Sequence, residues 1–280
     1  RPDKEDDRVR QIDALHAQTG PVLLAYESDV AVDAMLADIT RGRPDVDLVA
    51  DDGIGHALWV VRDDVLIGKI TAAFDGMNAL YIADGHHRSA AASRVAASHA
   101  GVEAAAYFLT VIFPHRQMQI LDYNRVVRDL AGMSTEEFLA RVVEAFTVTP
   151  VNEAVHPDGP GAFGMYLAGQ WYRLDIHADR VPDDPVGRLD VSLLASHLLA
   201  PVLGIDDPRR DKRIDFVGGI RGLAELERRV DSVDMAVAFS MYPTSMEDLM
   251  AVADAAEVMP PKSTWFEPKL ADGLVSHVLE

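Results

Sequence analysis

Short apolar runs alternate with amphipathic segments along the whole chain. Runs of adjacent apolar residues predict buried strands over 21–26, 56–61, 80–83, 107–113 and 235–241. Apolar residues that recur at helical spacing predict helices over 3–18, 30–39, 63–74, 89–100, 134–146, 190–203, 223–230 and 246–256. A hairpin is expected over 164–176, and an extended segment over 265–279.

This alternation of strands and helices is typical of an α/β or α+β fold, with a mixed sheet and flanking helices. The stretch 151–161 is rich in proline and glycine and is therefore expected to be a loop. We expect a division there into a region 1–150 and a C-terminal region 151–280 that packs on it. The first residue is Arg rather than Met, so an additional N-terminal part is expected to be missing.

Composition narrows the range of functions. The 280 residues include 26 Lys and Arg against 45 Asp and Glu, which gives a net charge of −19, and no Cys. Without cysteine there is no disulfide scaffold, cysteine nucleophile or thiolate metal site. The negative charge argues against nucleic-acid and membrane-surface partners. No apolar run reaches the roughly 18 residues of a membrane span, and no signal peptide is seen, so a cytoplasmic location is expected.

The densest group of reactive side chains is Asp84-Gly85-His86-His87-Arg88, between a short apolar run and an alanine-rich helix. Free N–H groups at a helix start favour anions, Gly85 allows a ligand to approach the backbone, and Arg88 suits phosphate. Asp84 could hold a metal ion or take a proton from a substrate hydroxyl. Adjacent helical residues point about 100° apart, so His86 and His87 are expected to bind phosphate rather than chelate a metal. The alternative is a helix cap with a solvated first turn.

Two further stretches combine scarce cations with glycine or hydroxyl residues. In the first, Lys212 and Arg213 are candidates for a second phosphate contact, and Asp215 for a base or metal ligand. In the second, the cofactor-binding candidates are Lys262, Ser263 and Thr264, which look like the end of a Walker A motif without its glycines. The alternatives are a salt-bridged surface turn for the first stretch and a proline-bounded loop for the second.

Several blocks together resemble a bacterial and archaeal family known as domain of unknown function 1015. They are Lys4-Glu5-Asp6 with Arg8, the block Ile82 to Arg88, Tyr123-Asn124-Arg125, and three pieces of the tail, Met259 to Thr264, Pro268-Lys269 and Gly273-Leu274-Val275. The resemblance implies a function in serine or phosphoserine metabolism and a further N-terminal region. The turn around Asp84 also looks like the phosphate-binding turn of the ParB/sulfiredoxin-like superfamily, which implies such an element around 56–100. By that likeness Gly85, His86 and His87 would hold phosphate oxygens, Arg88 would neutralise charge, and Asp84 would contact the substrate hydroxyl or metal.

These observations favour a phosphotransferase acting on a small hydroxy amino acid, with free serine as the best candidate. The expected donor is ATP, ADP or pyrophosphate with Mg²⁺, and the catalytic candidates are Asp84, His86 and Asp215. Two alternatives stay open: a nucleotide-binding regulatory switch, and a metal-dependent phosphatase that uses Asp84, His86 and His87. The expected partners are the substrate and nucleotide, with either a homodimer or an association with the missing N-terminal part.

Overall fold

The computed structural model describes residues 2–267 and 269–279. The chain forms two compact units. Unit 1 comprises residues 1–118 together with 268–280, and unit 2 comprises residues 119–267. The position 150/151, where the sequence suggests a division, lies inside a strand of unit 2, and the loop that follows leads to another strand of the same sheet.

Unit 1 is built around a small mixed sheet. Its elements in chain order are α1 (Pro2–Leu15), β1 (Ala17–Gln18), β2 (Val22–Tyr26), α2 (Val30–Thr40), β3 (Val46–Val49), β4 (Gly55–Leu58), α3 (Asp64–Asp75), β5 (Tyr81–Asp84), α4 (His86–Ser98), η1 (Glu103–Ala106), β6 (Thr110–Pro114), η2 (His115–Gln117) and β15 (His277–Val278). The strand order is β5-β2-β6, with β6 parallel and β5 antiparallel to β2. Every residue of β2 is buried, as its continuous apolar run predicts.

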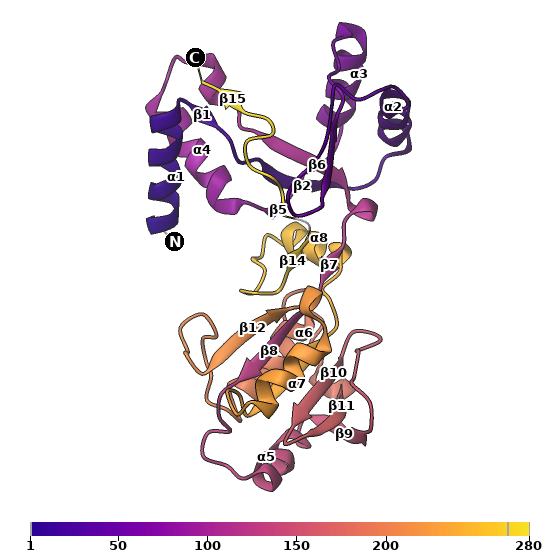
Figure 1. Ribbon diagram of the computed structural model, residues 1–280, viewed down its shortest axis with the longest axis vertical. Coiled ribbons are helices and arrows are strands. Elements are labelled where there is room, and N and C mark those ends of the chain that lie inside the picture. Colours follow the sequence, from indigo (N-terminus) through magenta and orange to yellow (C-terminus); the bar gives the residue numbers. More distant parts are fainter. Residues whose placement is uncertain (1, 268, 280) are drawn as a thin grey trace. The chain divides into compact units, whose positions relative to one another are not determined.

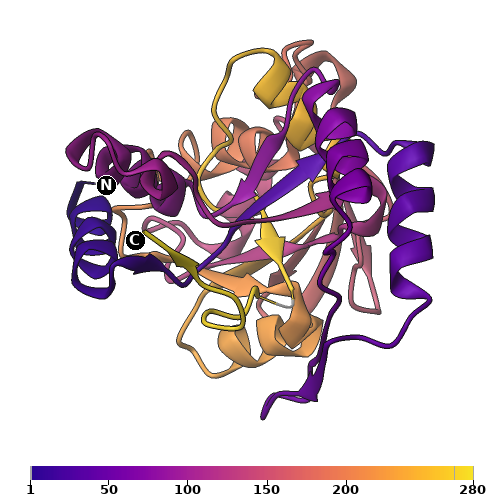
Figure 2. The same cartoon turned by 90° about the horizontal axis from the view of Figure 1, so that it is seen from above.

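Helices α1 and α4 lie side by side in Figure 1 and in Figure 2. Ile12 from α1 packs with Ala91 and Val95 from α4, and Leu279 from the end of the chain completes this small core. Helix α1 ends at Leu15, earlier than predicted, because His16 adopts a positive φ of 49° and the next residues pair with β15. This packing places the first turn of α4 beside α1.

Unit 2 is built around a six-stranded sheet. Its elements are β7 (Ile120–Leu121), β8 (Tyr123–Val127), α5 (Thr135–Val142), β9 (Phe146–Val151), β10 (Ala162–Leu167), β11 (Gln170–Ile176), η3 (Ala178–Arg180), α6 (Asp190–Leu194), the π-helical turn η4 (Ala195–Leu199), β12 (Ile214–Gly218), η5 (Gly219–Arg221), α7 (Leu223–Asp231), β13 (Val237–Met241), α8 (Met246–Asp254) and β14 (Trp265–Phe266). The order is β12-β8-β13-β10-β11-β9, and every neighbouring pair is antiparallel.

Both faces of this sheet are covered. Helix α7 lies across one face, where Leu226 and Val230 pack on Val126 and Ala238 (Figure 1). Residues of α5, α6 and α8 cover the other face and form the larger core around Phe239. Strand neighbours such as Ala238 and Phe239 therefore serve opposite layers, as the alternation of side chains along a strand requires.

The fold class is confirmed as a mixture of α and β structure with a mixed sheet and flanking helices. The predicted helix 190–203 is divided into α6 and η4, and the extended segment 265–279 holds only two short strands, β14 and β15. Strand β3 is absent from the predicted strands, and all four of its residues are exposed although three of them are apolar. Within the described residues, no helix is both long and apolar enough to cross a membrane.

Candidate functional site

The turn between β5 and α4 depends on Gly85. Its φ of 91° lies in the left-handed region, where a residue with a side chain would be strained. The Gly85 carbonyl accepts hydrogen bonds from the N–H groups of Arg88 at 2.8 Å and Ser89 at 3.0 Å. The N–H groups of His86 and His87 come before these first helical hydrogen bonds, so they are the donors that the turn can present, together with the partial positive charge of a helix start.

Asp84 is the last residue of β5 and lies half-buried at the entry to this turn. Its Oδ1 accepts a hydrogen bond from Gly85 N at 2.9 Å. The register of β2 against β5 shifts between Leu23 and Leu24, next to the pair Leu23–Asp84. Such bulges re-aim the side chains beside them. The sheet irregularity thus falls at the residue that the sequence singles out as base or metal ligand.

The two histidines of the turn lie against each other, with ring centroids 4.1 Å apart. His87 Nδ1 lies 3.4 Å from Glu5 Oε1 on α1, which connects the turn to that helix. Desolvation lowers the pKa of His86 below its ordinary value, and His87 lowers it further. This shift favours the neutral imidazole, which can both donate and accept a hydrogen bond.

Arg88 folds back over the turn. A Cβ atom added to Gly85 would lie 3.0 Å from Arg88 Nε, so the missing side chain makes room for the guanidinium. The Nε atom is buried and has no hydrogen-bond partner among the described residues. A buried, unsatisfied donor is costly, and it marks a position where a ligand oxygen would be stabilised.

Arg88 lines a pocket within unit 1 together with residues from α1, from the 17–22 segment and from the C-terminal segment. The lining residues are Arg8, Gln11, Ile12, Ala17, Gln18, Thr19, Gly20, Val22, Arg88 and Asp272. Arg8 Nη1 donates to Gln11 Oε1 at 2.7 Å. Two arginines therefore face one carboxylate, Asp272, so the pocket has a surplus of positive charge in an acidic chain.

Arg8 belongs to one of the sequence motifs, but the motif does not indicate that its side chain lines a pocket. Gln11, Thr19 and Asp272 were not identified at all. The helical spacing of Arg8, Gln11 and Ile12 is the signal that could have found the α1 side of the pocket, because i, i+3 and i+4 share one helix face. Asp272 comes from a segment distant in sequence, which the Gly273 N–H attaches to the Thr19 carbonyl at 2.8 Å.

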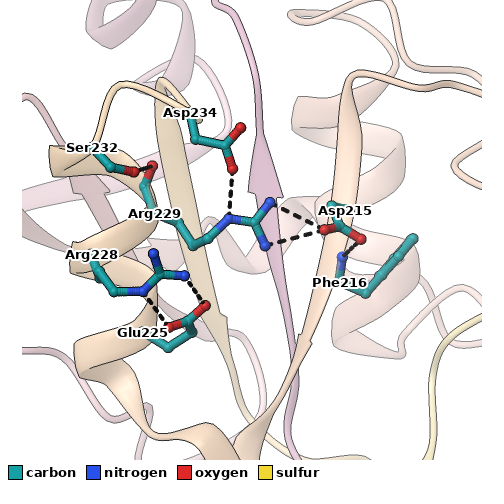
Figure 3. Close-up of polar contacts among 7 residues, drawn as sticks. All are labelled: Asp215, Phe216, Glu225, Arg228, Arg229, Ser232 and Asp234. Atoms are coloured by element: carbon teal, nitrogen blue, oxygen red, sulfur yellow. Dashed lines mark hydrogen bonds and ion pairs between the residues drawn. The ribbon is translucent and has the colours of Figure 1, made fainter.

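The remaining candidates lie in unit 2. Asp215 is on β12, and its Oδ2 accepts hydrogen bonds from both terminal nitrogens of Arg229 on α7 at 3.2 Å (Figure 3). Arg229 also donates to Asp234 at 2.9 Å, so it joins two carboxylates (Figure 3). The Asp215 carboxylate therefore takes part in an ion-pair network on the α7 face of the sheet.

Lys212 and Arg213 differ in their surroundings. Lys212 is exposed, whereas Arg213 donates to the carbonyls of Leu203 and Gly204 at 2.9 and 3.0 Å. Hydrogen bonds from the Arg213 guanidinium to Asp211 raise the Arg213 pKa and fix the side chain. Arg213 thus connects the start of β12 to the chain that follows η4.

The loop with Lys262, Ser263 and Thr264 lies on the opposite face from Asp215. Lys262 Nζ contacts Tyr123 Oη at 3.1 Å and lies over the Phe216 ring, and Phe216 points away from the face that Asp215 occupies. The buried Ser263 hydroxyl donates to the Pro260 carbonyl at 2.7 Å, while Thr264 is half-buried. The structure therefore does not bring Asp215 and Lys262 into one site.

A metal ion has one candidate carboxylate at the turn. Across residues 2–267 and 269–279, no three His, Asp or Glu side chains gather as a metal site. Mg²⁺ is commonly held by one or two carboxylates together with substrate phosphates, and Asp84 fits that simpler arrangement.

Two kinds of similarity to known proteins are found, one to a family and one to solved structures. The family described as "Protein of unknown function (DUF1015)" matches residues 1–192. No curated protein matches the chain. Among solved structures, free serine kinase in complex with AMP is 14% identical with a TM-score of 0.48, covering 97% of this chain and 84% of that chain. A variant of free serine kinase in complex with ADP is 16% identical with a TM-score of 0.44, covering 98% and 85%. A conserved hypothetical protein from Pyrococcus furiosus is 14% identical with a TM-score of 0.45, covering 97% and 87%. At these identities and TM-scores, the names of these proteins assign no function to this chain.

Proposed function

The chain belongs to the DUF1015 family, and we propose that it is a phosphotransferase that acts on a small hydroxy amino acid, with free serine as the first candidate. The donor would be ATP, ADP or pyrophosphate. The choice of serine comes from the resemblance of the sequence motifs to that family. The choice of phosphoryl transfer rests on the pocket beside the Asp84–Arg88 turn.

One observation carries the proposal: Arg88 Nε is buried and has no hydrogen-bond partner in the described part of the chain, in a pocket that also holds Arg8. A buried unsatisfied donor costs about 1–3 kcal/mol, and more if it is charged. A phosphate group offers three acceptor oxygens and negative charge, which would satisfy the Arg88 donor and offset the surplus of arginine. The open N–H groups at the start of α4 would supply further donors.

Asp84 begins the same turn and is the proposed catalytic group, although it is not among the residues that line the pocket. Phosphoryl transfer depends on position and on charge neutralisation. In the proposed reaction the substrate oxygen forms a bond to phosphorus, the bond from phosphorus to the donor's leaving oxygen breaks, and Asp84 takes the hydroxyl proton. Arg88 neutralises charge on the transferred group, and neutral His86 orients an oxygen by a hydrogen bond. A bound Mg²⁺, held by Asp84 and phosphate oxygens, would supply further charge neutralisation.

The test is product formation by the intact chain. L-Serine is incubated with Mg²⁺ and, separately, with ATP, ADP and pyrophosphate, and O-phosphoserine is measured by phosphorus NMR. We expect product with one of these donors, and a loss of roughly 10²- to 10⁴-fold in rate for Asp84→Asn, because a general base contributes that much. Asp38→Asn is the matched control, since Asp38 forms a solvent-exposed ion pair with Arg41 on α2.

Three outcomes separate the alternatives. Absence of product with every donor would refute the phosphotransferase, and full activity of Asp84→Asn would refute the role of Asp84 as its base. Tight nucleotide binding without turnover would instead support a regulatory switch. Release of phosphate from O-phosphoserine that stops when metal is chelated would support the phosphatase.

A further inference from the structure

The Lys262 loop of unit 2 is held in a strained conformation. Lys262 has a φ of 61°, a left-handed value that is costly for a residue with a side chain. Three hydrogen bonds fix the loop: Arg125 Nη2 donates to the Lys262 carbonyl at 2.9 Å, Ser263 Oγ to Pro260 O at 2.7 Å, and Thr244 Oγ1 to Ser263 O at 3.0 Å. Strained residues of this kind persist where the surroundings determine them, and they are concentrated at functional sites.

Arg125 is an unusual anchor for a surface loop. Its side chain lies on β8 and the residue is only 4% exposed. Its guanidinium donates to the carbonyls of Tyr123 and Lys262 and lies 5.6 Å from the centre of the Phe216 ring. Burial lowers the pKa of Arg125 to about 10. No carboxylate is among these contacts, so the fold keeps a desolvated positive charge next to Lys262.

The Lys262 side chain presents its ammonium group at an aromatic surface. Its Nζ lies 3.1 Å from Tyr123 Oη, 5.4 Å from the centre of the Tyr123 ring and 5.6 Å from that of Phe216. Trp265 packs edge-on against Tyr123, with centroids 4.9 Å apart. Within the described part of the chain, the ammonium contacts are this hydroxyl and these rings, and none is a carboxylate. Lys262 is exposed, so a ligand can reach it.

The hydrogen-bond donors of this cluster are not all used. An ammonium has three N–H donors, and one of them is directed to Tyr123 Oη. Because Tyr123 accepts that bond, its own O–H group remains a donor beside the ammonium group, at a residue that is 7% exposed. Lys262 and Tyr123 can therefore both donate to the same oxyanion. The buried charge of Arg125 adds to the attraction, in a chain whose net charge is −19.

We propose that Lys262 and Tyr123, on the loop anchored by Arg125, form a binding site for a small oxyanion in unit 2. Its ligand is the carboxylate or phosphate group of a small molecule. Every residue of this site lies in unit 2, so the proposal is independent of the pocket in unit 1 and of the phosphotransferase activity.

The experiment uses Trp265 as a reporter in the full chain. The protein has three tryptophans, Trp59, Trp171 and Trp265, so its nitrogen-15 spectrum has three indole N–H signals, which Trp265→Phe assigns. Inorganic phosphate and L-serine are titrated separately up to about 10 mM, which reveals Kd values near 1 mM. We expect a saturable shift of the Trp265 signal with at least one ligand. A response to serine alone indicates a carboxylate site, and one to phosphate alone a phosphate site.

Substitutions decide whether the response belongs to this site. Lys262→Met keeps the aliphatic stem and removes the charge, and we expect binding roughly tenfold to a hundredfold weaker, as for the loss of a charge-assisted hydrogen bond. Lys69→Met removes an exposed lysine on α3 in unit 1, and Arg88→Met alters the unit 1 pocket; both should leave the Trp265 response unchanged. An unchanged Trp171 signal verifies that unit 2 of Lys262→Met is folded.

The proposal is overturned if neither ligand shifts the Trp265 signal, or if the shift survives Lys262→Met. A shift that disappears in Arg88→Met as well as in Lys262→Met would also overturn it as an independent site. Absence of serine phosphorylation would leave it intact, because the measurement is of binding in unit 2.

Discussion

Asp190, the first residue of α6, gives the sharpest prediction about stability. It is 8% exposed, and its Oδ1 accepts a hydrogen bond from Gly161 N at 2.7 Å. Its Oδ2 is buried without a hydrogen-bond partner among the described residues. Burial raises the pKa of Asp190 to about 7, Asp248 contributes in the same direction, and the Gly161 bond opposes the rise. The perturbation is Asp190→Asn, which keeps an acceptor for Gly161 and cannot ionise.

The sign follows from proton binding. In the unfolded chain the carboxyl ionises near pH 3.8, whereas in the folded chain it holds its proton to about pH 7. Between these values the folded state binds more protons, so a rise in pH favours unfolding. At 1.36 kcal/mol per pH unit, the difference amounts to roughly 4 kcal/mol, lost as pH rises from about 4 to about 7 and constant above that.

The assay is urea unfolding between pH 4 and pH 9, followed by tryptophan fluorescence in a Trp59→Phe background. The remaining reporters, Trp171 and Trp265, both lie in unit 2 with Asp190. We expect the stability of Asp190→Asn relative to the parent to increase by up to roughly 4 kcal/mol from pH 4 to pH 7 and then to level off. A difference that does not change with pH would refute the assigned burial of a neutral carboxyl.

Two further predictions test the turn and the Arg213 anchor. Gly85→Ala should cost about 1–3 kcal/mol of unfolding free energy and also weaken phosphate binding, because the new Cβ meets the Arg88 guanidinium. Gly53→Ala is the control, since Gly53 has a similar positive φ but open space around it, so denaturation and phosphate titration of both variants should separate backbone strain from the Arg88 contact. Equal phosphate affinities of the two variants would contradict the explanation. Arg213→Met should lower the stability of unit 2 by about 1–3 kcal/mol in urea unfolding, because two carbonyls lose their hydrogen-bond donor. Arg210→Met, at an 88% exposed side chain, should change the stability by less than about 0.5 kcal/mol. Equal effects of the two substitutions would argue against Arg213 as an anchor of the loop.

The sequence predicted most elements of the fold and the turn of the candidate site. The Asp84–Arg88 block was identifiable because its chemistry is local: a strand end, a glycine and a helix start are adjacent in sequence. The pocket was not identifiable, since Asp272 reaches it only through the return of the C-terminal segment to unit 1. The loop 151–161 has the composition of a boundary, yet it connects β9 and β10 of one sheet.

The candidate residues of unit 2 show a different limit of what can be predicted from the sequence. Asp215 and Phe216 are adjacent, so strand alternation sends them to opposite faces, and Lys262 contacts Phe216. Alternation was available from the sequence, but which face the 260–264 loop would cover depends on the long-range Arg125 bond. The sequence marks Arg213 as a candidate phosphate ligand by its charge alone. Its hydrogen bonds to the carbonyls of Leu203 and Gly204 cannot be predicted from residue types, because every residue has a backbone carbonyl.

The most direct test of the central claim is nucleotide binding at the unit 1 pocket. Isothermal titration with ATP and ADP is carried out in the Lys262→Met background, which removes the site proposed for unit 2. Arg88→Met is compared with Arg94→Met, on the same helix, whose arginine forms an ion pair with Asp6. The Arg88 pocket predicts a roughly tenfold to hundredfold loss of affinity for Arg88→Met and little change for Arg94→Met. Equal nucleotide affinities of the two variants would contradict it.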